Sequence, residues 1–516
     1  MAKCNRQSTV LIALALCSAG AWATVPDSTL QHVQHEEYGY ISNIRQGSAN
    51  PTSLAATPLS GLALVKAGYD WQRGAYHSPD AGRGTDGFFV EAYGLRRTSK
   101  LIFEGVFTYR NENELSKKWN STLYQSTLNP FVLADSMPSD YNKEKFHIAG
   151  RVSWNVNSRL RLGLNADYHV GVQSDEKDPR LEAKGMRFIL NPGVEYDCGI
   201  ASVGLTAGIN LLNESEQYSS LNTTVTHRFF LMGGLGTFYP QSGTAYSRDV
   251  KGTSWFAEPS VKFRIGSKAS DFLSIRFDSY SENATDGGSS YRFLGGDWSD
   301  RCFRVYDRFS FFRGRYSHNF ELHGRYDDSK GTWYDQRAVT ENGTTRYEVV
   351  NSSVKHKQSV VQASLCYRLD RLDSSMTPTF TASVSAGFES ASATNYPEYY
   401  TRKTSHAVAT AMAMKRWVFG KVVMRVRADV SYRAKLSSSI NAQGLELYEK
   451  YSFPMYAWQS SSSLTARGRV NVDIPLGRMI LGAEAYGGSM ICTDGATSVY
   501  NGETSDFAGG SLRLYF

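Results

Sequence analysis

Long stretches of this chain alternate apolar and polar residues with a period of two, and this pattern constrains the fold more than any other feature. In a β-strand, successive side chains point to opposite faces, so the two sets separate. Between Arg159 and Val170, one face carries Leu160, Leu162, Leu164, Ala166, Tyr168 and Val170, and the other carries Arg159, Arg161, Asn165, Asp167 and His169. Between Lys421 and Arg433, one face carries Val422, Met424, Val426, Ala428, Val430 and Tyr432, and the other carries Val423, Arg425, Arg427, Asp429, Ser431 and Arg433. The pattern predicts an all-β fold.

Alternation alone does not say whether the apolar face meets a protein core or lipid, because a soluble sandwich would bury the same face inward. The N-terminus favours lipid. Lys3 and Arg6 precede the apolar run Val10 to Leu16, and Ala21-Trp22-Ala23 ends it with small residues. This is the arrangement of a secretory signal peptide. We therefore expect residues 1–23 to be removed from a secreted protein.

The C-terminus favours lipid too. The chain ends on a strand-like segment whose one face carries Leu512, Leu514 and the terminal Phe516. This face resembles the signature that outer-membrane barrels present to the barrel assembly machinery. The mean hydropathy is −0.38, and no stretch has the roughly 18 apolar residues that a membrane-spanning helix needs. The expected fold is a transmembrane antiparallel up-and-down β-barrel in the bacterial outer membrane, in contact with membrane lipid and lipopolysaccharide.

Short and long connections alternate along the chain, as they do in such barrels. Tight turns are predicted at Arg97 to Lys100, Asn157, Cys198, Gly266 to Ala269, Gly314, Asp370 to Ser375, Gly420 and Pro475 to Gly477. Long extracellular loops are predicted at Arg73 to Arg83, Asn111 to Asn142, Gln173 to Lys184, Asn213 to Lys251, Ser281 to Asp300, Asp328 to Ser353, Ala391 to Arg402, Lys435 to Tyr456 and Ile491 to Glu503. These connections join about eighteen strands, provided that Phe229 to Pro240 lies outside the wall. About sixteen and about twenty strands are the alternatives.

Four segments resemble an outer-membrane β-barrel family of unknown function that is common in Bacteroidetes. They are Tyr76-His77-Ser78-Pro79, the hairpin Gly87 to Arg110, Asn129 to Ser136 and Phe229 to Gly236. The resemblance runs over most of the mature chain and implies fold and location only, since that family offers no catalytic residues to transfer.

A second, more distant resemblance concerns the segment before the first strand. Ala49-Asn50-Pro51-Thr52-Ser53-Leu54 is similar to the element that precedes the barrel of long-chain fatty-acid transporters, although Thr52 and Ser53 depart from it. In that family the preceding segment is a hatch inside the barrel. Residues 24–60 are thus either a lumen plug or an irregular periplasmic lead, and residues 61–516 form the barrel.

The predicted inner wall is rich in arginine. The expected lumen lining is Arg159, Arg161, Asp167, Arg276, Arg304, Arg308, Arg325, Arg368, Arg425, Arg427, Asp429, Arg467 and Arg469. Further inward carboxylates include Asp278, Glu321 and Asp473. A positive lining would favour anions. The alternative is that the arginines pair with these carboxylates across strands and fill the interior.

A barrel of this size is too wide for side chains alone to fill, so a loop or water must occupy it. The segment Asn213 to Lys251 is the candidate insert. Its Gly233-Gly234-Leu235-Gly236 core permits close backbone approach to the wall, and a constriction is expected from Phe229, Phe230, Phe238 and Tyr239.

Three classes of function remain, in this order: a pore or transporter for small solutes, a surface interaction or assembly and secretion component that uses its loops, and an outer-membrane hydrolase. The inward residues His147, His169 and His323 have no nucleophile beside them by spacing, so they are assigned as polar lumen residues and no enzyme is expected. No cofactor motif is present. Once Cys4 and Cys17 leave with the signal peptide, the four remaining cysteines Cys198, Cys302, Cys366 and Cys492 show no metal-ligand spacing, with one disulfide left open. Scattered basic residues give no support for nucleic-acid binding.

Overall fold

A computed structural model of the protein describes residues 47–57, 59–287, 291–341, 344–477, 479–495 and 499–516. The expected signal peptide, residues 1–23, and most of the segment 24–60 lie outside these ranges. No helix in the described ranges is long and apolar enough to cross a membrane.

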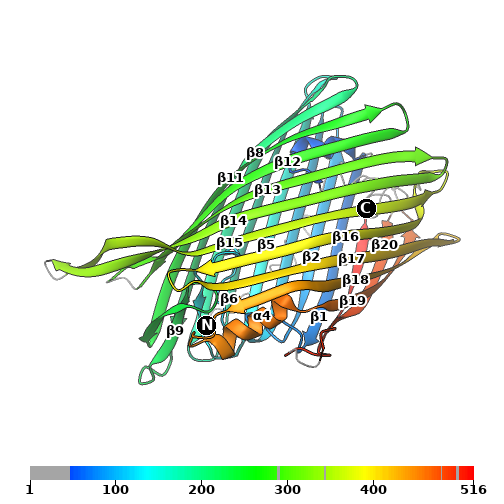
Figure 1. The fold of residues 1–516 in the computed structure, drawn as a ribbon. Helices are drawn as coiled ribbons and strands as arrows, with labels where there is room; N and C mark the ends of the chain where they lie inside the picture. Colours follow the sequence, from blue (N-terminus) through cyan, green and yellow to red (C-terminus); the bar gives the residue numbers. More distant parts are fainter. Residues whose placement is uncertain (1–46, 58, 288–290, 342–343, 478, 496–498) are drawn as a thin grey trace.

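Eighteen strands form one antiparallel sheet that closes on itself (Figure 1). The strands are β1 (Gly61–Gly74), β2 (Gly84–Arg97), β3 (Leu101–Lys117), β5 (Ser139–Asn155), β6 (Leu160–Ser174), β7 (Arg180–Asp197), β8 (Ala201–Ser219), β11 (Ala245–Ile265), β12 (Ala269–Asp286), β13 (Phe293–Arg313), β14 (Tyr316–Glu341), β15 (Thr344–Leu372), β16 (Pro378–Asn395), β17 (Tyr400–Phe419), β18 (Val422–Asn441), β19 (Ser463–Leu476), β20 (Met479–Cys492) and β21 (Thr504–Tyr515). Each pairs with the next in the wall, and β1 also pairs with β21 to close the ring, with Gly68 opposite Ser511. The expected eighteen-stranded up-and-down barrel is confirmed.

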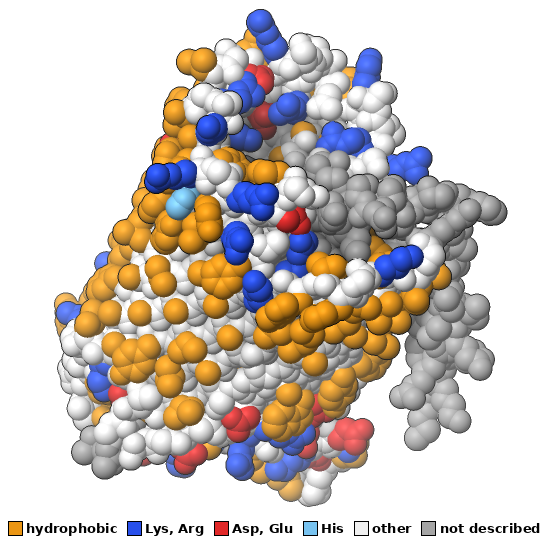
Figure 2. Space-filling view, turned by 90° about the vertical axis from the view of Figure 1, so that its right-hand side faces the viewer, with side chains coloured by type: hydrophobic (Ala, Val, Ile, Leu, Met, Phe, Trp, Pro, Cys, Tyr) orange, Lys and Arg blue, Asp and Glu red, His pale blue; other side chains and the backbone are white. Residues whose placement is uncertain are grey.

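The wall is apolar outside and polar inside. On β8, Val203 and Leu205 point outward and are each 51% exposed, while Asn210 and Glu214 point to the interior and are buried. Figure 2 shows hydrophobic side chains over the middle of the outer wall, with most charged side chains gathered toward its upper and lower margins. The alternation predicted for β6 is confirmed, because Leu162 and Leu164 are exposed on the outside.

The two ends of the barrel differ. We call the end that carries the C-terminal Phe516 and the tight connections the turn end, and the opposite end the loop end. All eight predicted tight turns fall between consecutive strands, as between Arg97 and Leu101 and between Phe419 and Val422. The prediction of the turns is therefore confirmed.

The strands run further toward the loop end than the sequence analysis predicted. The clearest correction concerns Asp328 to Ser353, expected as a long loop. Strands β14 and β15 continue through it and are paired from Tyr316 and Arg371 to Glu341 and Thr344. This hairpin projects beyond the rest of the barrel (Figure 1). Polar residues on both faces of a strand carry no period-two signal, although the backbone pairing continues.

A second, three-stranded sheet lies at the loop end. It consists of β4 (Leu133–Ala134), β9 (His227–Met232) and β10 (Phe238–Gly243), with β9 in the middle. We call it the inserted sheet. In this sheet β9 pairs with β10 on one side and with β4 on the other, and neither β9 nor β10 pairs with a wall strand. The predicted exclusion of Phe229 to Pro240 from the wall is therefore confirmed.

Both faces of the inserted sheet are buried. One face packs on inward side chains of the wall, in a cluster made of Phe131, Leu133, Tyr141, Leu181, Ala183, Tyr218, Phe229, Leu231, Tyr246, Trp298 and Trp333. The other face packs on the connection from β18 to β19, in a cluster made of Trp119, Ala134, Phe230, Met232 and Leu447. That connection forms the short π-helix η2 (Tyr448–Ser452) and the helix α4 (Phe453–Ser460). The loop end thus has an apolar core inside an otherwise polar barrel.

A short segment lies against the wall at the turn end. The 3₁₀ helix η1 (Pro51–Ala56) is capped by Asn50, whose side chain accepts a hydrogen bond from the backbone N–H of Thr52. This helix contacts β5, β6 and β7. Arg97 donates to the carbonyl of Ala55 at 3.2 Å and also to that of Thr57. Leu54 is fully buried in a cluster with side chains of β1, β2, β3, β20 and β21.

Candidate functional site: the barrel interior

Carboxylates of the wall hold the connection between β3 and β5, residues 118–138, inside the barrel. Glu214 on β8 accepts the backbone N–H groups of Leu123, Tyr124 and Gln125 at 2.5, 2.6 and 3.1 Å. Glu282 on β12 accepts the amide of Ser126 at 2.9 Å. Backbone amides inside a barrel must find acceptors, and these carboxylates supply them.

A fully buried ion pair supports the same connection. Arg248 on β11 donates to both carboxylate oxygens of Asp286 on β12 at 2.7 and 2.8 Å, and both side chains are 0% exposed. Its remaining amino group donates to the carbonyl of Phe131 at 2.9 Å. The arginine therefore fastens the inserted apolar core to the wall.

The glycine cluster brings the inserted sheet close to the opposite wall, as the sequence analysis expected. Gly234 has a φ of +92°, and a Cβ at this position would lie 2.4 Å from Nδ1 of His356. Asn395 on β16 donates to the carbonyls of Gly233 and Gly234 at 3.0 and 2.8 Å. A side chain would prevent these hydrogen bonds, so the close backbone approach is confirmed.

The four residues predicted to form a constriction belong to the inserted sheet. Phe229 and Phe230 are buried on its two faces, and Phe238 packs beside Phe230 with the ring centroids 5.0 Å apart. Tyr239 stacks on Trp333 of β14 at 3.8 Å. These rings hold the sheet in place, and a narrowing by the sheet as a whole stays a prediction.

A cavity of about 700 Å³ lies in the interior beside β11 to β17 and the segment that precedes η1. Its charged lining includes Arg276, Arg304 and Arg325 from the predicted set, together with Glu258, Glu321, His323 and Glu389. Arg304 and Arg325 are 44% and 41% exposed at their side chains, so both can contact a solute. Arg161 lines one smaller cavity. Another is lined by Arg425, Arg427 and Arg469.

Most of the predicted inward arginines pair with carboxylates. Pairs two residues apart on one strand are Arg276 with Asp278 (2.6 Å), Arg325 with Asp327 (2.6 Å), Arg368 with Asp370 (3.2 Å) and Arg427 with Asp429 (2.7 Å). Cross-strand pairs are Arg161 with Glu195 (2.5 Å), Arg304 with Asp278 (3.8 Å), Arg308 with Glu321 (3.7 Å), Arg469 with Glu484 (3.7 Å) and Arg425 with Asp473. The interior is thus of mixed charge, as the alternative of paired arginines expected.

Two arginines of the predicted lining differ from the rest. Arg159 is exposed in the turn before β6 and does not belong to the wall. Arg467 lies over the ring of Phe507, with 5.2 Å between the guanidinium carbon and the ring centroid.

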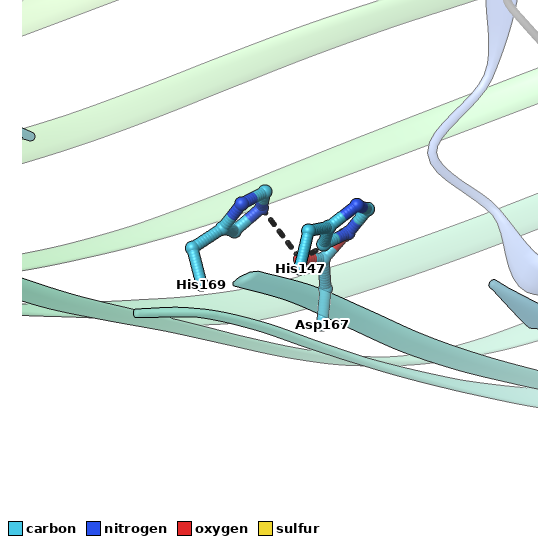
Figure 3. Close-up of side chains that lie close together, drawn as sticks. All are labelled: His147, Asp167 and His169. Carbon is cyan, nitrogen blue, oxygen red and sulfur yellow. Dashed lines mark hydrogen bonds and ion pairs between the residues drawn. The ribbon is translucent and has the colours of Figure 1, made fainter. Parts of the chain in front are cut away.

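The structure brings together three inward residues, of which the sequence placed only Asp167 and His169 on one strand face. His147 on β5 lies opposite His169 on β6, and Asp167 is on the same face two residues before His169 (Figure 3). Nε2 of His147 and Nε2 of His169 lie 3.1 and 2.8 Å from the same oxygen of Asp167. Only the strand register reveals this cluster, because His147 is distant from the other two in sequence.

Comparison with solved structures gives matches that cover most of this chain. The RagAB peptide importer is 7% identical, with 88% of this chain and 86% of that chain covered and a TM-score of 0.39. For the copper transporter OprC the identity is 8%, the coverage 87% and 80%, and the TM-score 0.40. For BauA, the ferric preacinetobactin receptor from Acinetobacter baumannii, the identity is 7%, the coverage 88% and 80%, and the TM-score 0.39.

Comparison with sequences gives one family. Curated protein sequences yield no significant match. A family model described as a family of unknown function, DUF6850, matches residues 51–516, which include the whole barrel and η1. The chain therefore belongs to this family of unknown function.

Proposed function

We propose that this protein is an outer-membrane barrel that admits small polar solutes through its interior. The observation that carries the proposal is the closed wall itself, apolar outside and polar inside, around a cavity of about 700 Å³. A closed barrel leaves no unpaired strand edge, which is what the hydrocarbon of a bilayer requires. The expected signal peptide and the Leu512, Leu514 and Phe516 face support the outer membrane, with the turn end toward the periplasm.

The mixed charge of the lining indicates what kind of solute suits the cavity. Arg304 and Arg325 are partly exposed there, and Glu389 on β16 is 38% exposed at its side chain. Groups of both signs suit small polar or zwitterionic solutes. Because carboxylates accompany most of the arginines, the anion preference that the arginine excess predicts should be weak.

Solute entry into proteoliposomes tests this proposal. Protein folded into vesicles should give osmotic swelling with small amino acids and monosaccharides and less swelling with oligosaccharides, whereas unfolded protein added to the same vesicles should give none. A folded barrel that is impermeable to all solutes, both intact and without its inserted sheet, would contradict the proposal.

A second candidate function is surface interaction, favoured by the projecting β14–β15 hairpin. Val349 and Val350 near its tip are 48% and 67% exposed, although they lie beyond the apolar part of the wall. Replacing residues 335–351 with a two-residue turn keeps Trp333 and should leave the barrel folded. Loss of binding to a partner isolated with the intact protein, without any change in solute entry, would favour this second function.

A further inference from the structure

The cluster formed by His147, Asp167 and His169 has the donor set of a metal centre. The two imidazole rings are stacked, with centroids 4.1 Å apart and an angle of 2° between them. Both Nε2 atoms face the same carboxylate, and one donor atom from each residue lies within 4.8 Å of the others (Figure 3). Zinc binds histidine nitrogen and carboxylate oxygen at roughly 2.0–2.2 Å, and because the two rings are parallel, they must tilt toward each other for the three atoms to share one ion.

We propose that His147, Asp167 and His169 bind a divalent transition-metal ion on the inner wall. Two imidazoles and one carboxylate suit zinc, copper and nickel rather than calcium or magnesium, which prefer oxygen ligands. The three side chains are 28%, 23% and 32% exposed, so an ion in the lumen can reach them. Three protein ligands leave a coordination position for water or a solute.

The neighbouring cations have partners of their own. Arg187 on β7 lies opposite His169, but its Nε donates to Asn210 at 3.1 Å. Lys145 on β5 pairs with Glu112 at 3.3 Å. Asp167 is thus the carboxylate that both histidines share, and a bound ion would add the positive charge that it can balance.

The connection 118–138 links this site to the inserted sheet at the loop end. The ring of Tyr124 lies 6.3 Å from that of His169, and its backbone amide is held by Glu214 at 2.6 Å. An ion bound here would lie next to the connection 118–138. The site goes beyond the proposed passage of solutes and does not depend on it.

Zinc binding to untagged, chelator-treated barrel in detergent, measured by isothermal titration calorimetry, tests the site. The intact protein should bind one ion, and His147→Gln, His169→Gln and Asp167→Asn should each weaken binding at least about tenfold, since each removes a ligand. His323→Gln is the matched control, because His323 also faces the interior beside a carboxylate, Glu321 at 3.7 Å. This variant should bind zinc as the intact protein does. Equal loss in the control, or full binding by a His147→Gln/His169→Gln double variant, would overturn the proposal.

Copper binding to the intact protein gives a readout that does not depend on the variants folding. Electron paramagnetic resonance of one equivalent of Cu²⁺ should show coupling to two nitrogens. A spectrum with oxygen ligands only would overturn the proposal.

Discussion

At the scale of single residues, the interior is organised by charges two positions apart on one strand. Residues at i and i+2 share a face, so an Arg-x-Asp sequence places a cation and an anion side by side in the lumen. Arg325 and Asp327, 2.6 Å apart, are an example that could be read from the sequence. The pairing of Arg425 with Asp473 could not, because it needs the register of β18 against β19.

The buried pair Arg248 and Asp286 should show how much such charges depend on each other. Arg248→Met should lower the free energy of unfolding by about 3–5 kcal/mol, because it leaves a carboxylate buried without its cation. Arg248→Met/Asp286→Leu should recover most of that loss. Urea unfolding of protein folded into lipid vesicles measures both. A double variant as unstable as the single one would show that the contact of Arg248 with the Phe131 carbonyl matters more than the ion pair.

Two adjacent residues of β18 test which face meets lipid. Val430 is exposed on the outside, and Ser431 faces inward, where its hydroxyl lies 2.9 Å from that of Thr410 on β17. Val430→Arg should lower the free energy of unfolding in vesicles by about 2–4 kcal/mol if it lies near the bilayer midplane, since it puts a charge in hydrocarbon. Ser431→Arg is the matched control and should cost much less. The reverse order would shift the assignment of the two faces by one residue.

At the scale of elements, the sequence predicted where chains turn better than where strands end. Each tight turn has a local signal, such as Gly266, Gly314, Gly420 or Gly477, all with a φ near +60°. The parts of β14 and β15 at the loop end lack such a local signal for where the strand ends, because apolar alternation marks only the part of a strand that meets lipid.

The inserted sheet was predictable only in part. Phe229 to Met232 is apolar on both faces, which a wall strand with a polar lumen side would not be, but its place outside the wall entered the sequence analysis only as a condition of the count of eighteen strands. Its partners β4 and η2 come from connections far away in the chain, and no local pattern names them. The same limitation hid the cluster of His147 with Asp167 and His169.

Gly234 gives a test of how the inserted sheet is held. Gly234→Ala should loosen the sheet, because a positive φ strains any other residue and the new Cβ would meet His356. Hydrogen exchange of residues 227–243 should become about tenfold faster or more, corresponding to a strain of about 1–3 kcal/mol. Gly444→Ala, where a Cβ meets only Tyr400 at 3.6 Å, should leave that exchange unchanged. Equal exchange rates in both variants would show that the sheet does not depend on its approach to β15 and β16.

At the scale of the whole molecule, the wall and its contents do different tasks. The wall gives an apolar exterior and a closed ring of hydrogen bonds, whereas the inserted sheet, residues 118–138 and η1 occupy parts of the interior at its two ends. The inserts are fastened by wall residues such as Glu214, Arg248 and Asn395, so their positions are properties of the barrel and not of free loops.

If the interior conducts solutes, removing the inserted sheet should open it. Replacing residues 221–243 with a short glycine–serine turn between β8 and β11 removes β9 and β10 and leaves the wall pairing of Tyr218 with Tyr246 in place. Single-channel conductance in planar bilayers should then rise several-fold, because the apolar core around Phe229 and Phe230 is lost and residues 118–138 lose their packing partner. Replacing residues 345–349 on the projecting hairpin with serine serves as the control, since these residues lie outside the interior core, and it should not change the conductance. A deletion variant that folds to a heat-modifiable barrel yet conducts no better than the intact protein would show that the inserted sheet is not the barrier.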